Sequence, residues 1–404
     1  MCAPILDSYV EECDIRHLEL ALFCRTMLSI TGTITLNPRV GRATIKHVAS
    51  QAGVSTQTVS RVVNERPDVA VETRRKVQGV IDKLGYRPSA LARSLIRQRS
   101  YTLVVVTAGL RHIGPSRTLS GITAAAADAG YALLLEELPR YDTDDTAPIF
   151  EALISRHVDG VIWAVPEVGT NRRWMEGLPL ELGIPIVYLA MEPRQNISVV
   201  SINNYLGGQL AMGHLLQQGY RRIAHITGPM DWWEARQRQA AWKAALIEAG
   251  LEAPEVRCAE GNWSPASGAE AMELLLGRAR ELEAVFAAND QMALGALQVA
   301  ARHGRRVPQD LAVVGFDNIP ESAYFVPSLT TVQQDQYDVG MVAVEEMTRI
   351  IESGWQGLDP IGPKSIMLSP TLVVRQSSSR PTEKSEGGGK ADDQERSRKK
   401  EVLA

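Results

Sequence analysis

The sequence has no membrane-spanning stretch, few cysteines and none of the common catalytic motifs. None of its apolar runs approaches the ~20 residues that a transmembrane helix needs. The apolar residues 18–24 are interrupted by Glu19 and follow acidic residues, which argues against a secretory signal. The four cysteines lack metal-ligand spacing and do not suggest a disulfide framework: Cys2, Cys13, Cys24 and Cys258. These absences predict a protein of the reducing cytoplasm, with no cofactor, no metal and no membrane partner.

Motifs of enzyme active sites are missing as well. The chain has no phosphate-binding loop of the Walker type, no GxGxxG turn after the first strand of its α/β part and no GxSxG nucleophile elbow. The seven histidines are scattered, without a neighbouring Cys or Ser motif. We therefore expect a binding protein and not an enzyme.

Positive charge is concentrated in one stretch of an otherwise mildly acidic chain. Residues 43–99 contain eleven Lys/Arg against four Asp/Glu, whereas the whole chain has a net charge of −4. Such a basic module is the usual electrostatic footprint of a partner rich in phosphates. A solvated helical bundle with an incidental charge excess is the alternative.

The same stretch has the pattern of three short helices. Thr44 is placed to cap a first helix, Gly53 supplies a left-handed turn, and Ser55 is placed to cap a second helix. A third helix closes the small core, whose predicted members are Ile45, Val48, Ala49, Ala52, Val59, Val62, Val63, Val77, Val80, Ile81 and Leu84. The second helix keeps a polar outer face near its start, namely Thr56, Gln57, Ser60 and Arg61. This is the arrangement of a helix-turn-helix, whose second helix meets base edges in the major groove.

Ordered motifs in this stretch resemble the DNA-binding headpiece of the LacI (lac repressor) family. They are TIK at 44–46, VAxxAGVSxxTVSRVxN at 48–64, ETRxxV at 72–77 and GYRPSALARSL at 85–95. The resemblance implies a homodimer on a near-palindromic double-stranded operator, with a hinge helix that enters the minor groove and Leu95 as its wedge. The implied DNA-contacting residues are Thr44, Ser55, Thr56, Gln57, Ser60, Arg61, Asn64, Tyr86, Ala92, Arg93 and Leu95. His47 departs from the family, which usually has an acid there.

From residue 101 onward, strands and helices alternate and the pattern restarts near Asn203. Repeated βα units predict parallel sheets with helices on both faces, and the restart predicts two lobes facing a cleft. Expected strands are 103–106, 132–135, 160–163, 185–189, 223–227, 284–287 and 311–315. Expected helices are one ending at Gly130 and those at 152–156, 206–218, 234–250, 266–276 and 290–303.

Residues 102–375 resemble the periplasmic-binding-protein-like core of the same family. The motifs include GYRRIAHITGP at 219–229, ANDQMALGAL at 288–297 and VVGFDN at 313–318. The resemblance implies that the chain crosses between lobes more than once and that a helix at 335–354 returns to the first lobe. The expected fold is an N-terminal all-α helix-turn-helix headpiece with a hinge helix, plus an α/β core of two doubly wound parallel-sheet lobes.

Alignment to the family pattern also implies an effector site in the cleft. The implied ligand-contacting residues are Arg140, Arg238, Trp263, Asn289, Asp317 and Gln334. Carboxylate, amide, guanidinium and indole groups together suit a polyol such as a sugar. Simpler roles remain open, because Asp317 could cap a loop, Asn289 could cap a helix and Trp263 could belong to the core. Ala190 and Asn203 depart from acids frequent in the family.

The two ends of the chain fall outside the resemblance. Residues 1–42 form either a docked amphipathic helix or a segment upstream of a true start such as Met27. The polar residues 377–404 are expected to be disordered, and they contain no leucine heptads, which favours a dimer over a tetramer. The predicted domains are therefore an extension (1–42), the headpiece and hinge (43–99), the effector-binding and dimerisation core (100–376) and a tail (377–404).

The function that these resemblances imply is transcriptional regulation. We expect a sequence-specific repressor of sugar-utilisation genes that a small sugar releases from its operator. A corepressor-dependent regulator of the same family is the first alternative, and a sugar-binding protein that does not bind DNA is the second. The sequence does not decide between release and tightening by the effector.

Overall fold

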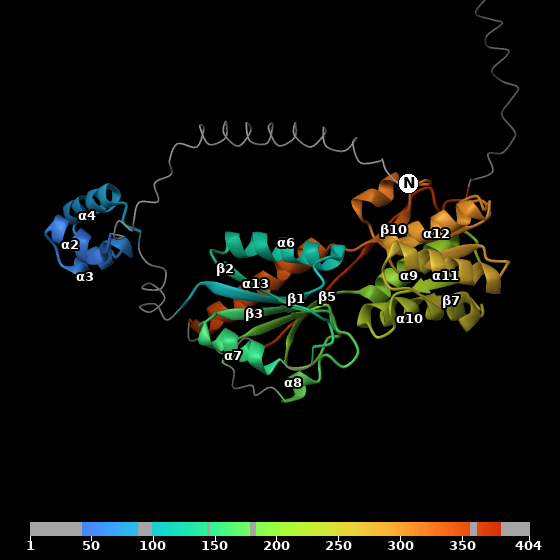
Figure 1. Cartoon of the computed structure of the whole chain (residues 1–404), viewed down its shortest axis with the longest axis horizontal. Helices are drawn as coiled ribbons and strands as arrows, with labels where there is room; N and C mark the ends of the chain where they lie inside the picture. The colour runs from blue at the N-terminus through green and yellow to red at the C-terminus, as the bar shows by residue number, and fades with distance from the viewer. Residues whose placement is uncertain (1–42, 88–98, 144–145, 178–182, 356–361, 381–404) are drawn as a thin grey trace, which may run out of the picture. The chain divides into compact units, whose positions relative to one another are not determined.

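The computed structural model describes residues 43–87, 99–143, 146–177, 183–355 and 362–380 (Figure 1). The headpiece and the α/β core belong to two separate compact units. Within these ranges, no helix combines the length and the apolar character that crossing a bilayer would require. The predicted extension at 1–42 lies outside the described residues.

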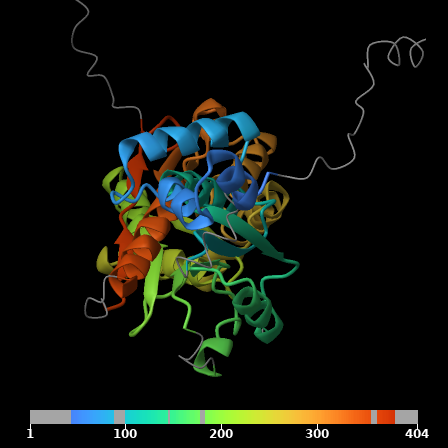
Figure 2. The same ribbon diagram turned by 90° about the vertical axis from the view of Figure 1, so that its left-hand side faces the viewer.

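The headpiece is a bundle of three helices, α2 (Ile45–Ala52), α3 (Thr56–Val63) and α4 (Val71–Leu84), which Figure 2 shows in blue. Its fully buried side chains are Val48, Ala49, Ala52, Val59, Val62 and Val77. Five further predicted core residues are only partly buried against this cluster: Ile45, Val63, Val80, Ile81 and Leu84. The predicted helix-turn-helix core is thus confirmed, with a smaller contribution from α4 than its periodicity suggests.

Helix α2 begins with a reciprocal cap that explains the unusual His47. The His47 backbone N–H donates to Thr44 Oγ1 at 3.4 Å, and the Thr44 N–H donates to His47 Nδ1 at 3.3 Å. The imidazole thus takes the place that a Glu or Gln occupies in the usual capping box. The helix ends at Gly53, whose φ of 64° is a left-handed conformation that glycine adopts without strain.

Removing this cap should loosen α2 measurably. Thr44→Ala deletes the acceptor for the His47 N–H, which costs about 1 kcal/mol. Amide hydrogens of α2 should then exchange about fivefold faster in the full-length protein. The matched control is Ser50→Ala, since Ser50 is exposed within the same helix and caps nothing. Equal exchange rates in the two variants would show that the cap does not stabilise the helix.

The core consists of two lobes, each built on a six-stranded sheet. The first sheet has the order β11-β5-β4-β3-β1-β2 and the second has the order β12-β10-β9-β8-β6-β7. The strands of the first lobe are β1 (Thr102–Ala108), β2 (Ala132–Leu138), β3 (Gly160–Ala164), β4 (Ile186–Leu189), β5 (Ser198–Ile202) and β11 (Ser365–Leu368). Those of the second lobe are β6 (Ile223–Thr227), β7 (Cys258–Glu260), β8 (Ala284–Ala287), β9 (Ala312–Asp317), β10 (Thr330–Gln333) and β12 (Thr371–Val373).

Helices cover both faces of each sheet, as the alternation predicts. In the first lobe, α6 (Ile113–Asp128) and α13 (Gln336–Trp355) pack side by side on one face, and α7 (Ala147–Ser155) packs on the other (Figure 1). The short α8 (Trp174–Gly177) also belongs to this lobe. The helices of the second lobe form two packed pairs, α9 (Asn204–Gln217) with α10 (Trp233–Glu248) and α11 (Pro265–Arg278) with α12 (Asp290–Arg302). Two short 3-10 helices complete it, η2 (Glu255–Arg257) and η3 (Pro320–Tyr324).

The chain crosses between the lobes three times. It passes from β5 to α9, from β10 to α13, and from β11 to β12. The predicted return of the 335–354 helix to the first lobe is confirmed, because α13 packs on α6 and on the face of the first sheet. The carboxyl ends of the parallel strands of the two lobes therefore contribute to one cleft.

Two expectations about the core need correction. The second sheet is not wholly parallel, because β12 runs antiparallel to β10 at its edge. The core also continues past residue 376, since Ser377 and Ser378 are fully buried. Ser377 Oγ donates to the Val313 carbonyl, and the Val313 N–H donates to the Ser377 carbonyl at 2.9 Å. These serines complete the lobe that the polar composition assigned to the tail, while residues 381–404 lie outside the described part.

Candidate DNA-binding surface and effector site

Helix α3 presents three exposed polar side chains, two in its first turn and one in its last turn. Ser55 caps the helix by accepting a hydrogen bond from the Thr58 N–H at 3.0 Å. Thr56, Gln57 and Arg61 are exposed on the helix that it begins. Arg61 forms an ion pair of 3.5 Å with Asp68, and both side chains are about half exposed. Such a pair is weak and leaves the guanidinium available to another acceptor.

The other predicted DNA contacts in the headpiece have local structural roles. Asn64 Nδ2 donates to the Ser60 carbonyl at 2.8 Å, and both residues are partly buried. Tyr86 packs against the headpiece core, and Thr44 caps α2. The predicted hinge contacts Ala92, Arg93 and Leu95 lie outside the described residues.

A cavity lies between the two lobes of the core, and we call it the inner cavity. The first lobe lines it with side chains from the start of α6 and from the ends of β3 and β4, and the second lobe contributes α10 and the ends of β8 and β9. Five of the six predicted ligand residues line it: Arg238, Trp263, Asn289, Asp317 and Gln334. The structure therefore brings together residues that are up to 96 positions apart in the sequence.

Arg238 is the buried cation of the inner cavity. Its Nε donates to Asn204 Oδ1 at 2.9 Å, and its Nη1 donates to the Ala288 carbonyl. The guanidinium carbon lies 3.7 Å from the centre of the Phe316 ring. Burial lowers the pKa of Arg238, while the neighbouring carboxylates of Asp317 and Glu234 oppose that shift. The side chain is thus held rigidly before any ligand arrives, which limits the entropy lost on binding.

Asp317 supplies a carboxylate at the end of β9. One of its oxygens accepts a hydrogen bond from Gln334 Nε2, which fixes the side chain. Burial raises the pKa of Asp317 to about 6, against the opposing effects of Arg238 and of the Gln334 hydrogen bond. The group is therefore mostly ionised at neutral pH and can accept hydrogen bonds from hydroxyl groups. Gln334 Oε1 is buried and has no partner within the described residues.

Trp263 also lines the inner cavity, and its indole packs closely against Gly228. A Cβ on Gly228 would lie 2.1 Å from the indole, so this position after β6 requires glycine. Asn289 holds the loop by donating from Nδ2 to the Trp263 carbonyl at 3.0 Å, and it caps α12 by accepting from Met292 N at 2.8 Å. The capping role considered for Asn289 is therefore present alongside its place in the cavity. Trp263 is only partly buried, and its Nε1 has no partner within the described residues.

Glu234 lines the inner cavity as well, although it is not among the predicted ligand-contacting residues. It lies in the first turn of α10, and its Oε2 is buried without a partner in the described part of the chain. Burial raises the pKa of Glu234 to about 7, partly opposed by Arg238. The spacing of Glu234 and Arg238, one helical turn apart, could have indicated that both face the cleft.

This buried acid should make the stability of the core depend on pH. The folded chain holds the Glu234 proton up to a pH of about 7, whereas the unfolded chain releases it near 4.5. The unfolded state therefore binds fewer protons across that window, and stability falls as the pH rises through it. Glu234→Gln should reduce the drop in Tm between about pH 5 and about pH 8. The control Glu248→Gln, at an exposed position of the same helix, should leave that drop unchanged; a drop that is equally large in both variants would contradict the assignment.

Arg140, the sixth predicted ligand residue, does not line the inner cavity. It lies after β2 and forms two hydrogen bonds with Asp142, at 2.8 and 2.7 Å. Both residues line a separate hollow, the outer hollow, at the carboxyl ends of β1 and β2. The alignment placed Arg140 correctly at a strand end, but β2 is the edge strand of the sheet and lies farther from the inner cavity.

A short backbone pairing joins the lobes beside the inner cavity. Val168 of the first lobe forms an antiparallel bridge with Trp232 of the second. The Gly169 N–H donates to the Asp231 carbonyl at 2.8 Å, and the Trp233 N–H donates to the Glu167 carbonyl at 3.1 Å. Any change in the angle between the lobes at this point must alter these bonds.

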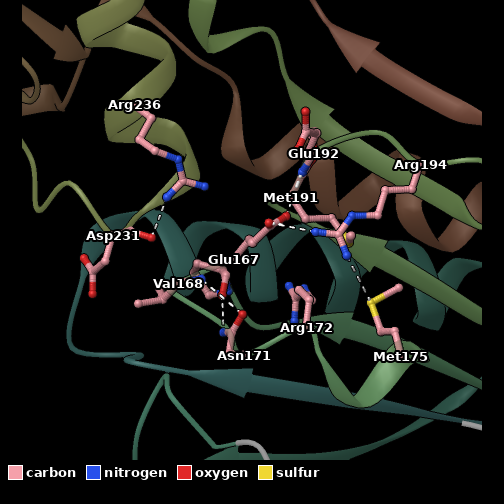
Figure 3. Close-up of polar contacts among 12 residues, drawn as sticks. Glu167, Val168, Asn171, Arg172, Met175, Met191, Glu192, Arg194, Asp231 and Arg236 are labelled. Atoms are coloured by element: carbon pink, nitrogen blue, oxygen red, sulfur yellow. Dashed lines mark hydrogen bonds and ion pairs between the residues drawn. The ribbon is translucent and has the colours of Figure 1, made fainter. Parts of the chain in front are cut away.

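Side chains fix the first-lobe half of this pairing (Figure 3). Asn171 accepts from the Val168 N–H at 3.1 Å and donates to the Pro166 carbonyl at 2.8 Å. The carboxylate of Glu167 accepts from Arg194 at 2.8 Å and from the Glu192 N–H at 3.1 Å. The loop is therefore rigid enough to hold its backbone groups toward the second lobe.

Two family models match the chain. "Bacterial regulatory proteins, lacI family" matches residues 44–89, and "Periplasmic binding protein-like domain" matches residues 212–378. The ribose operon repressor of Escherichia coli K12 is 33% identical over 337 residues, which cover 83% of this chain and 99% of the relative.

Two solved structures share the whole architecture. A lac repressor dimer bound to operator and the anti-inducer ONPF is 30% identical, with a TM-score of 0.75 over 84% of this chain and 100% of that chain. A complex of the transcriptional regulator CelR with cellobiose is 32% identical, with a TM-score of 0.62 over 83% and 100%. Each of these relatives is a transcriptional regulator.

Proposed function

The chain belongs to the LacI family of bacterial regulatory proteins and is a DNA-binding transcriptional repressor, and we propose that a small sugar in its inner cavity releases it from operator DNA. The observation that carries this proposal is the joint presence of Asp317, Arg238 and Trp263 around one cavity between two lobes. A carboxylate and a guanidinium pair with hydroxyl groups, and an indole covers the apolar face of a sugar ring. The unpartnered atoms of Glu234, Gln334 and Trp263 supply further donors and acceptors.

On the DNA side, we propose that α3 enters the major groove with Thr56, Gln57 and Arg61 toward the bases. The capped start of α3 and the exposure of these three side chains support this arrangement. Two copies of the chain form a homodimer on a near-palindromic operator in the cytoplasm. The implied hinge residues Ala92, Arg93 and Leu95 then meet the minor groove between the two headpieces.

The two lobes couple these sites. A sugar in the inner cavity contacts both lobes at once, so it stabilises the lobe angle that fits it best. That angle determines the pairing of Val168 with Trp232. In the homodimer it also determines the distance between the two copies of β1, each of which follows the hinge residues of its own protomer. A ligand shifts this equilibrium only by its difference in affinity for the two states.

Linkage gives a direct test of the coupling. If a sugar weakens operator binding by a given factor, the operator must weaken sugar binding by the same factor. The sugar affinity should therefore be measured by calorimetry, with and without DNA from the protein's own upstream region. D-ribose, D-glucose and cellobiose are suitable probes. A sugar that binds equally well in both conditions would contradict the proposal, and one that binds better with operator would indicate a corepressor.

A further inference from the structure

The outer hollow lies next to the inner cavity and has a different lining. Trp232 lines both, so its indole forms part of the wall between them. The remaining lining includes Tyr141 and five charged side chains: Arg111, Glu137, Arg140, Asp142 and Asp231. We propose that the outer hollow is a second sugar subsite, so that the effector is a disaccharide with one ring in each space. This inference rests on the proposed function of the inner cavity.

A row of three aromatic rings in contact runs from the outer hollow to the inner cavity. The Tyr141 ring lies 4.8 Å from the Trp232 ring, and the Trp232 ring lies 5.7 Å from that of Trp263. The interplanar angles are 66° and 69°, which are edge-to-face contacts. Successive aromatic side chains along a path suit successive sugar rings, since each ring has an apolar face to cover.

Tyr141 lines the outer hollow and carries a hydroxyl group that no other described residue pairs with. A Cβ on Gly109 would lie 1.6 Å from Tyr141 Oη, so only glycine at this position lets the tyrosine lie there. Oη is buried and has no hydrogen-bond partner within the described residues. Burial raises the pKa of Tyr141 above its ordinary value, so the group stays protonated and able to donate. A buried donor without a partner costs free energy that a ligand hydroxyl would recover.

The charges of the outer hollow favour a neutral ligand over an anion. Its lining carries two arginines and three carboxylates, and Arg140 is already neutralised by the two hydrogen bonds to Asp142. Arg236 donates at 2.7 Å to the Asp231 backbone carbonyl (Figure 3), and no side chain among the described residues pairs with the Asp231 carboxylate. A phosphorylated or carboxylated sugar would face this carboxylate, whereas neutral hydroxyl groups pair with both signs of charge.

The test compares a disaccharide with its own monosaccharide. Cellobiose against D-glucose, and lactose against D-galactose, should be titrated into the full-length protein and followed by calorimetry. At least one disaccharide should bind about tenfold more tightly than its monosaccharide, as one or two additional hydrogen bonds allow. Arg140→Ala and Tyr141→Phe should each reduce that advantage severalfold and leave the monosaccharide affinity unchanged. Neither Arg140 nor Tyr141 lines the inner cavity, and Tyr141→Phe keeps the ring that packs on Trp232.

Arg156→Ala is the matched control for the loss of one arginine. Arg156 is exposed at the end of α7, just before β3 begins. It therefore lies near the amino ends of the parallel strands, whereas the outer hollow lies at their carboxyl ends. Its replacement should leave both affinities unchanged. Two results would overturn the proposed subsite but not the proposed effector site in the inner cavity. One is a monosaccharide that binds as tightly as its disaccharide, and the other is a higher affinity for the disaccharide that persists in both Arg140→Ala and Tyr141→Phe. Failure of every sugar to bind would overturn the proposed function as well.

Discussion

Replacing Asp317 with asparagine should abolish the response to the effector and leave operator binding unchanged. Asparagine has the same shape, so the hydrogen bond from Gln334 and the backbone at the end of β9 can persist. The variant loses only the negative charge beside Arg238, and with it the charge-assisted hydrogen bonds to ligand hydroxyl groups. Effector affinity should fall roughly 10- to 150-fold, the range expected for hydrogen bonds to a charged group.

The measurement pairs effector binding with DNA binding in the same preparations. Asp128→Asn is the control, because Asp128 is exposed at the end of α6 and outside both cavities. It should behave as the unchanged protein does in both assays. An Asp317→Asn variant that still leaves the operator at the normal sugar concentration would show that the inner cavity is not the effector site.

Arg61→Ala should remove most of the preference for operator over unrelated DNA. The guanidinium is about half exposed on α3 and forms an ion pair with Asp68 at 3.5 Å. A bidentate contact from arginine to a base contributes ~1–3 kcal/mol to discrimination, so specific binding should weaken roughly 5- to 150-fold. Non-specific binding should weaken much less, because it depends on the summed phosphate contacts.

A second arginine in the headpiece separates the loss of charge from the loss of base contact. Arg75 is exposed on α4 and does not belong to the α3 face. Arg75→Ala should therefore affect operator and unrelated DNA alike, at any salt concentration. If Arg61→Ala also weakens the two equally, Arg61 contacts phosphates and the proposed orientation of α3 is wrong.

Local sequence signals predicted the elements well because local forces determine them. Thr44, Gly53 and Ser55 cap or terminate helices through contacts within four residues, and each takes the predicted position. The core helices and seven of its strands also follow their apolar periodicity. Five strands escaped prediction, namely β5, β7, β10, β11 and β12. Four of them are only three or four residues long, which is too short for a clear periodic signal.

The cavity was harder to predict because its geometry depends on the packing of both lobes. Asp317 and Asn289 were identifiable at strand ends, where parallel sheets bind ligands. Glu234 was not among the predicted ligand-contacting residues, because its place in the inner cavity depends on how the two lobes pack, and Arg140 was among them although β2 lies at the sheet edge. Ser377 was assigned to a polar tail because nothing in the nearby sequence reveals its bonds to Val313.

Binding of the full-length protein to a labelled fragment of its own upstream DNA, repeated across a panel of sugars and purines, tests the central claim most directly. We expect tight, salt-sensitive binding that one sugar reverses and that unrelated sugars and purines leave unchanged. Tightening by a small molecule would contradict release and indicate corepression. Binding that no compound alters would contradict effector control, and a failure to prefer this DNA over unrelated DNA would contradict recognition of an operator in its own upstream region.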